Sequence, residues 1–90
     1  MKGMIQMKLL NELPVVVEAL RKIQHEIPLY AEQLKASGNY NDFETRLAWD
    51  CMRAVMGTEW ICSMYAKYNC NDTHLTTLAK RALKEVYKMQ

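Results

Sequence analysis

Apolar residues recur at helical spacing from Asp42 to about Tyr68, and they fall on two sides of the helix that this spacing predicts. One stripe consists of Phe43, Leu47, Cys51, Val55, Ile61 or Cys62, and Tyr65. The second, the aromatic–Met stripe, consists of Trp49, Met52, Met56, Trp60 and Met64. A helix that is apolar on most sides must be covered nearly all round. This long central helix therefore needs neighbours on two sides, and Gly57 in its middle is expected to weaken or bend it.

A second helical pattern precedes the central helix. Asn11 is a suitable N-cap, and apolar residues then recur at helical spacing as far as Leu34. Pro28 interrupts this pattern, because proline removes one main-chain hydrogen bond and crowds the preceding turn. We therefore expect a kink or a short break between residues 25 and 29. Gly38 follows the pattern at a place where a left-handed C-cap is favoured.

Two further helix starts are indicated by Asn and Asp residues. In the sequence Asn41-Asp42-Phe43-Glu44, an Asn or Asp side chain is expected to cap the central helix while Glu44 reaches back to it. Residues 69–72 predict a turn that ends in Asp72 as the next cap. A third helix follows, and its apolar face consists of Leu75, Leu78, Ala79, Ala82, Leu83 and Val86.

These patterns predict an all-α fold. The expected architecture is a small three-helix bundle or helical hairpin with a kinked first helix and a long central helix. Ninety residues are enough for one core, so residues 1–90 are expected to form a single all-α domain in which residues 1–10 are flexible or accessory. The hydrophobic content of 50%, with only three Gly and two Pro, is typical of a folded, helix-rich chain.

Composition also limits where the chain works. A net charge of +2 does not by itself indicate nucleic acid or an acidic membrane as partner. No stretch reaches the ~18 apolar residues of a membrane span, and residues 1–8 lack the apolar core of a secretion signal. Three cysteines without a C-x-x-C pair are typical of reduced thiols. We therefore expect a cytoplasmic protein with no membrane partner.

The residues that carry catalytic or metal chemistry form no recognisable motif. The serine, cysteine and histidine residues lie outside any nucleophile elbow, and the glycines are too scattered for a phosphate loop. Cys70, Asp72 and His74 are metal-ligand types at alternate positions, but no paired cluster supplies the other ligands of a structural zinc site. Cys51 and Cys62 are eleven residues apart, close to three turns, so both are expected to be inert buried thiols on one face. We expect no enzyme activity, cofactor or metal.

The aromatic–Met stripe has two interpretations. The neighbouring helices can cover the stripe that contains Phe43 and Leu47, and large aromatic and flexible residues grouped on a helix are typical of partner surfaces. The first interpretation is therefore an interface, most simply in a symmetric homo-oligomer. The second is that a kinked first helix wraps round and makes both stripes core. The predicted interface comprises Trp49, Met52, Met56, Trp60 and Met64 with the polar edge Arg46, Asp50 and Arg53, whose spacing favours mutual pairing.

A nucleic-acid interface is an alternative. Residues 64–84 loosely resemble a helix-turn-helix, whose second helix presents polar and basic residues to the major groove. The basic face of the third helix, which also suits an acidic protein partner, comprises Lys67, His74, Thr77, Lys80, Arg81, Lys84 and Lys88. Three features depart from the motif: Tyr65 stands where a small residue is wanted, the turn lacks Gly, and the preceding helix is several times too long. A solvated basic face also explains the charges.

A second alternative is an oligomeric protein that sequesters a small ligand such as a nucleotide. Aromatic and arginine side chains stack on bases and bind phosphate. The residue types for this are Arg46, Arg53, Trp49, Trp60, Tyr40 and Tyr65, although their spacing does not single out a nucleotide.

The function expected from the sequence is stoichiometric protein–protein interaction without catalysis. A compact, Met-rich helical chain of this length is similar in general character to the small proteins of phages and other mobile elements, which often bind and block a host protein. That likeness implies a host or cognate protein as the partner of an inhibitor.

Overall fold

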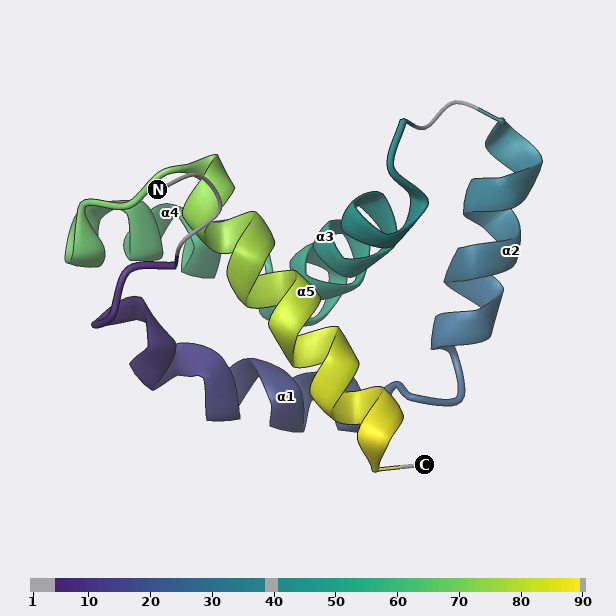
Figure 1. The fold of residues 1–90 in the computed structure, drawn as a ribbon, viewed down its shortest axis with the longest axis horizontal. Helices are drawn as coiled ribbons and strands as arrows, with labels where there is room; N and C mark the ends of the chain where they lie inside the picture. Colours follow the sequence, from purple (N-terminus) through teal and green to yellow (C-terminus); the bar gives the residue numbers. More distant parts are fainter. Residues whose placement is uncertain (1–4, 39–40, 90) are drawn as a thin grey trace.

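The computed structural model describes residues 5–38 and 41–89. Within them the chain is helical and contains no strand, which confirms the predicted all-α class. The elements are a short 3-10 helix, η1 (Leu9–Glu12), and the α-helices α1 (Leu13–Lys22), α2 (Ile27–Ser37), α3 (Phe43–Met56), α4 (Thr58–Tyr68) and α5 (Asp72–Lys88) (Figure 1).

Helix α5 is the centre of the fold. It packs against both α1 and α3, which also contact each other, and it lies across them in Figure 1. Helices α2 and α4 each pack against α3 and lie at opposite ends of the molecule. The predicted apolar face of α5 is confirmed, because all six of its residues are no more than 2% exposed: Leu75, Leu78, Ala79, Ala82, Leu83 and Val86.

The N-terminal segment contributes to the core. Leu9, which lies within the segment expected to be flexible or accessory, is 0% exposed and belongs to the same hydrophobic cluster as α1 and α5. The prediction that Asn11 is the N-cap of the first helix was wrong. Asn11 lies within η1, and α1 begins after Glu12 without a side-chain cap. Burial of Leu9 gives the chain an anchor ahead of α1 that local capping signals do not predict.

The helical chain is interrupted at residues 23–26, slightly before the predicted stretch 25–29, so the expected kinked helix is two separate helices. Helix α1 ends at Lys22, a turn occupies residues 23–26, and Pro28 lies in the first turn of α2. There its missing N–H costs nothing, because the first amides of a helix have no partner inside the helix. Gly38 ends α2 with φ 63°, as predicted for a left-handed cap.

The expected long central helix does not form. Helix α3 ends at Met56, and α4 starts at Thr58 after Gly57, which has φ 86° and ψ 159°. Only glycine adopts this conformation readily, and it turns the chain rather than merely bending it. The sequence pattern ran through Gly57 without interruption, so the prediction of a three-helix bundle was wrong in its helix count.

The predicted Asn or Asp cap of α3 is confirmed, whereas the cap of α5 differs from the predicted one by one residue. For α3 the N-cap is Asp42, whose carboxylate accepts hydrogen bonds from the Thr45 amide (3.2 Å) and hydroxyl (2.6 Å). These bonds, the hydroxyl first, hold the pKa of Asp42 below its usual value. For α5 the N-cap is Asn71 rather than Asp72. Its side chain accepts from the His74 amide while His74 Nδ1 accepts from the Asn71 amide, which makes a capping box.

Candidate functional site

The aromatic–Met stripe is divided between α3 and α4 and is partly internal. Met52 is 0% and Met64 is 5% exposed, so both are core residues of this chain. The other three, Trp49, Met56 and Trp60, are half-buried and pack against the same core. The structure therefore leaves no continuous exposed apolar stripe along α3 and α4, because the turn at Gly57 separates its two halves.

The polar edge of α3 pairs as its spacing predicts. Asp50 Oδ1 lies 3.3 Å from Arg46 Nε and 3.6 Å from Arg53 Nη2. Both arginine side chains remain about half exposed, at 52% and 56%. Exposed pairs of this kind add little stability. Their main consequence is that Arg46 and Arg53 share one carboxylate and keep exposed surface.

An open hollow of about 380 Å³ lies beside Trp49, between the N-terminal ends of α3 and α5. Its lining residues are Asn41, Asp42, Thr45, Arg46, Trp49, Asp72 and Thr76. Two carboxylates in this set oppose a phosphate, and Arg46 is already paired with Asp50. Of the nucleotide-binding set, the lining contains only Arg46 and Trp49, and Tyr40 lies outside the described residues. The hollow therefore does not assemble the predicted nucleotide site.

The outer side of α5 carries a basic ridge, defined by Thr77, Lys80, Arg81 and Lys84, which together line a shallow hollow of about 300 Å³. The ion pairs found among the described residues do not involve Lys80, Arg81 or Lys84. Lys88 differs, because its amine lies 3.4 Å from Glu85. The ridge thus presents three cations that the described part of the chain does not neutralise by ion pairing.

A groove adjoins the ridge between α3 and the C-terminal half of α5. This α3–α5 groove has a volume of about 280 Å³ and is lined by Phe43, Glu44, Leu47, Lys80, Leu83, Lys84 and Tyr87. Leu47 and Leu83 are buried, whereas Tyr87 is 47% exposed. Lys35 of α2 places its amine 5.7 Å from the centre of the Phe43 ring, within the range of a cation–π contact. The groove therefore combines an apolar floor with a rim that is mainly basic.

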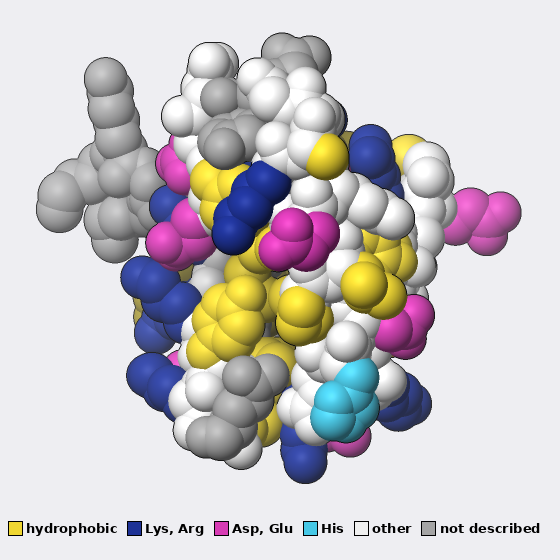
Figure 2. Space-filling model, turned by 90° about the vertical axis from the view of Figure 1, so that its right-hand side faces the viewer, with side chains coloured by type: hydrophobic (Ala, Val, Ile, Leu, Met, Phe, Trp, Pro, Cys, Tyr) yellow, Lys and Arg dark blue, Asp and Glu magenta, His cyan; other side chains and the backbone are white. Residues whose placement is uncertain are grey.

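Figure 2 looks onto the end of the molecule that carries α2 and the end of α5. Hydrophobic side chains gather in the middle of this face, and Lys and Arg side chains, interspersed with Asp and Glu, lie around them on several sides. The sequence analysis does not predict the groove, because it assigns Phe43 to the covered stripe and describes the face of α5 outside its apolar residues only by its charges. The available signal was Tyr87, a large aromatic residue outside the apolar face of the third helix.

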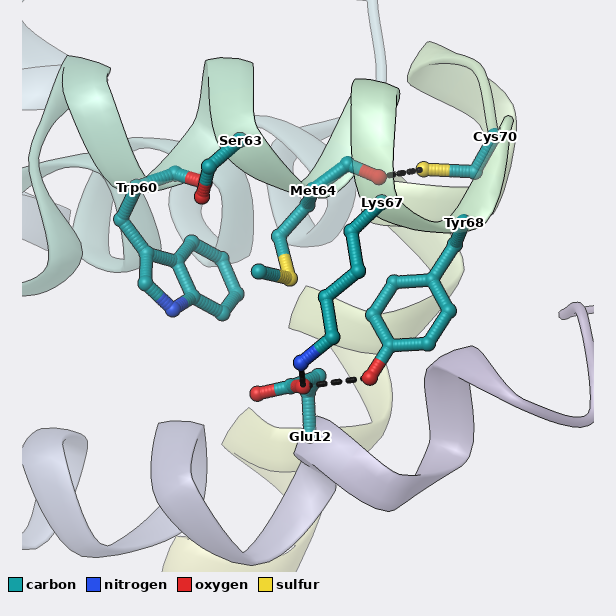
Figure 3. A network of polar contacts seen from close by, with 7 residues as sticks. All are labelled: Glu12, Trp60, Ser63, Met64, Lys67, Tyr68 and Cys70. Carbon is teal, nitrogen blue, oxygen red and sulfur yellow. Dashed lines mark hydrogen bonds and ion pairs between the residues drawn. The ribbon is translucent and has the colours of Figure 1, made fainter.

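The end of α4 is tied to the N-terminal segment by polar contacts (Figure 3). The Glu12 carboxylate accepts hydrogen bonds from Lys67 Nζ at 3.3 Å and from the Tyr68 hydroxyl at 2.5 Å. Hydrogen bonds to Tyr68 and Glu12 raise the pKa of Lys67, in that order. Trp60, Met64 and Lys67 project from α4 toward the segment that carries Glu12. Lys67 is therefore engaged on another side of the fold rather than joined to the basic ridge.

The α4–turn–α5 unit bears on the helix-turn-helix alternative. Because Gly57 breaks the central helix, the helix before the turn has only 11 residues, which removes one predicted departure from the motif. The Tyr65 hydroxyl donates to the Asp72 carboxylate at the start of α5, and burial followed by this bond raises the pKa of Tyr65 to about 12. A recognition helix contacts bases through its N-terminal residues. Here that end carries Asp72 and the His74 capping box, so the cations lie too far along the helix for this docking mode.

Cys70, Asp72 and His74, the residues of metal-ligand type near the turn, each form a hydrogen bond within the chain. The Cys70 thiol donates to the Met64 carbonyl oxygen over 3.3 Å. The Asp72 carboxylate accepts from the Tyr65 hydroxyl, and the His74 ring accepts from the Asn71 amide in the cap of α5. Among the described residues no group of His, Cys, Asp and Glu is arranged to hold a metal ion.

The three thiols have different surroundings. Cys51 is buried, and burial together with the charge of Asp50 raises the pKa of its thiol to about 11. Cys70 is half-buried, and Cys62 is exposed. The expectation that Cys51 and Cys62 are both buried on one face was wrong for Cys62, since it assumed an unbroken helix and Gly57 redirects α4.

Thiol reactivity is expected to report this difference. With Ellman's reagent at pH 8, Cys62 of the folded protein should react first and Cys70 more slowly. Cys51 should react only after unfolding, because its side chain is 0% exposed and its burial also raises the pKa of the thiol. The Cys62→Ser variant should lose the fast phase alone. Persistence of the fast phase in that variant would contradict the assignment.

Within the described ranges no helix has both the length and the apolar composition to cross a membrane. Comparisons of the chain with protein-family models, curated proteins and solved structures gave no match.

Proposed function

We propose that this chain is a non-enzymatic binding protein that acts by stoichiometric association with another protein. The observation that carries the proposal is that the basic ridge and the α3–α5 groove adjoin and share Lys80 and Lys84. An apolar depression beside cations that make no ion pair within residues 5–38 and 41–89 provides a buried anchor point and a polar rim, which is the usual anatomy of a protein interface. Occupying a partner's surface in this way, without chemistry, is how a small inhibitor of a host protein acts.

The two parts of this surface make different contributions to binding. Burial of an apolar side chain in the groove removes water from both surfaces and supplies most of the affinity. The cations on α5 attract an acidic partner, raise the association rate and fix its orientation. The surface therefore favours a partner with an acidic patch around a protruding apolar residue.

Nucleic-acid binding is the second candidate, supported by the row of cations on α5 behind a helix and a turn. Three observations favour protein instead. The net charge is only +2, Asp72 occupies the start of the helix, and the groove beside the ridge is lined by four apolar or aromatic residues: Phe43, Leu47, Leu83 and Tyr87. Phosphate contacts gain nothing from such a lining, and binding through them weakens steeply with salt.

Charge reversal on the ridge tests the proposal. The tagged full chain, treated with nuclease, is expected to capture a protein from an extract of its natural host, and the variant with Lys80, Arg81 and Lys84 all changed to Glu is expected to lose it. A matched control changes Lys8, Arg21 and Lys22 to Glu, which alters net charge equally at exposed sites in the N-terminal part of the chain. The proposal would be contradicted if nuclease treatment abolished capture by the unaltered chain. It would also be contradicted if the Lys8, Arg21 and Lys22 control lost capture to the same extent as the ridge variant.

A further inference from the structure

We propose that the α3–α5 groove is the docking site for an acidic amphipathic helix, and that it receives one large apolar side chain from that helix. This inference rests on the proposed function and names the chemistry of the partner segment. It depends on the size of the groove, on the charges of its rim and on the spacing of those charges along α5.

The groove has room for one large apolar side chain. Its volume is about 280 Å³, and its lining comes from α3 and α5. Leu47 and Leu83 form a buried apolar floor, and Phe43 and Tyr87 supply aromatic surface. Aromatic walls around a short apolar floor are typical of a pocket that holds an interface anchor residue.

The rim selects an acidic partner. Lys80 and Lys84 are four residues apart, so they lie one turn apart on the same side of α5. Their amines make no ion pair with the described carboxylates. Lys35 adds a third cation next to Phe43. Glu44 on α3 is the one carboxylate among the lining residues, which also include Lys80 and Lys84.

A helix presents the complementary pattern with few residues. Side chains at i, i+3 and i+4 share one face, so Glu residues one turn from a single apolar anchor lie on the face of the helix that meets the groove and its lysine rim. A nucleic acid would meet Glu44 and the apolar floor instead of the cations alone. The structure therefore favours an acidic helix over a phosphate backbone at this groove.

Designed peptides provide the test with the full chain. The probe is a fluorescent helical peptide of about 15 residues with a central Phe and Glu three and four residues to either side. Two variants replace the Phe by Ala or the Glu residues by Lys. Fluorescence anisotropy is expected to show saturable binding of the first peptide, and about tenfold or weaker binding of the other two, since the anchor's burial and the charges each contribute at least that factor.

Matched protein variants locate the site. Tyr87→Ala and the double variant Lys80→Glu with Lys84→Glu are expected to weaken binding of the Phe–Glu peptide by about tenfold or more. The double variant Arg21→Glu with Lys22→Glu, on α1, should bind within about twofold of the unaltered chain. Circular dichroism checks folding of each variant. If Tyr87→Ala loses helicity, the Lys80→Glu, Lys84→Glu variant alone locates the site. That variant changes polar side chains at the rim of the groove and leaves the apolar core unaltered.

Several outcomes would overturn the inference. Equal binding of the Phe and Ala peptides would show attraction by charge alone, and tighter binding of a single-stranded oligonucleotide at the same lysines would assign the surface to nucleic acid. A dimer in light scattering that dissociates on Tyr87→Ala would make a second copy the occupant. If the peptide does not bind at concentrations up to about 1 mM, the helix-in-groove mode is rejected, because such an affinity is too weak for a specific contact. Capture of a host protein through the ridge tests the proposed function separately.

Discussion

Replacing Met52 by alanine is expected to lower the free energy of unfolding by about 2–5 kcal/mol, the usual cost of truncating a large side chain in a packed core. Met52 is 0% exposed and lies on α3, the helix that contacts α1, α2, α4 and α5. Domains of this kind are stable by only about 5–15 kcal/mol, and each kcal/mol corresponds to about 4–8 °C in Tm at this size. Thermal unfolding followed by circular dichroism measures the loss.

The matched control is Met56→Ala, one turn further along the same stripe. Met56 is half-buried, so the same change should cost clearly less than at Met52. The loss at Met52 should not depend on protein concentration, because the side chain packs inside one chain. A loss that disappears on dilution, or a larger effect at Met56, would instead support the interpretation of the stripe as an interface between copies.

Replacing Gly57 by alanine is expected to destabilise the fold by about 2–3 kcal/mol, at the upper end of the cost of forcing a side chain into a sparsely populated backbone region. Gly57 has φ 86° and ψ 159°, while a Cβ at this position would meet no atom within 4 Å. The cost is therefore backbone strain and not a collision. Relief of that strain would join α3 and α4 into one helix and draw Ile61 and Met64, which are 5% exposed each, out of the core.

Gly38→Ala provides the comparison for Gly57→Ala. Gly38 also has open space around its Cα, but its φ of 63° and ψ of 9° are those of a left-handed cap, for which alanine costs about 1–2 kcal/mol. Urea unfolding of both variants should place Gly57→Ala below Gly38→Ala in midpoint. Equal midpoints, or a gain in helicity with no loss of stability at position 57, would show that the break between α3 and α4 does not need glycine.

Parts of the candidate site were predictable from local sequence. The pairing of Arg46 and Arg53 with Asp50 follows from i, i+4 and i, i+3 spacing, and the structure confirms it. The exposed cations of the third helix likewise follow from its amphipathic pattern. Lys67 was grouped with them by sequence proximity, yet it bonds to Glu12, 55 residues away. Sequence distance carries no information about such a contact.

Local sequence patterns were sufficient to predict the helical class, an interruption ahead of Pro28, the left-handed end of α2 at Gly38 and the apolar face of α5. These features depend on dihedral preferences and on a 3.6-residue period, which act over a few neighbouring residues. Local patterns could not predict that Met52 and Met64 are core residues, that Cys62 is exposed, or that Phe43 and Tyr87 line one groove. The physical reason is the direction taken by the chain at Gly57 and the crossing of α5 over α3, because packing between distant residues, and not local periodicity, determines which apolar side chains lose contact with water.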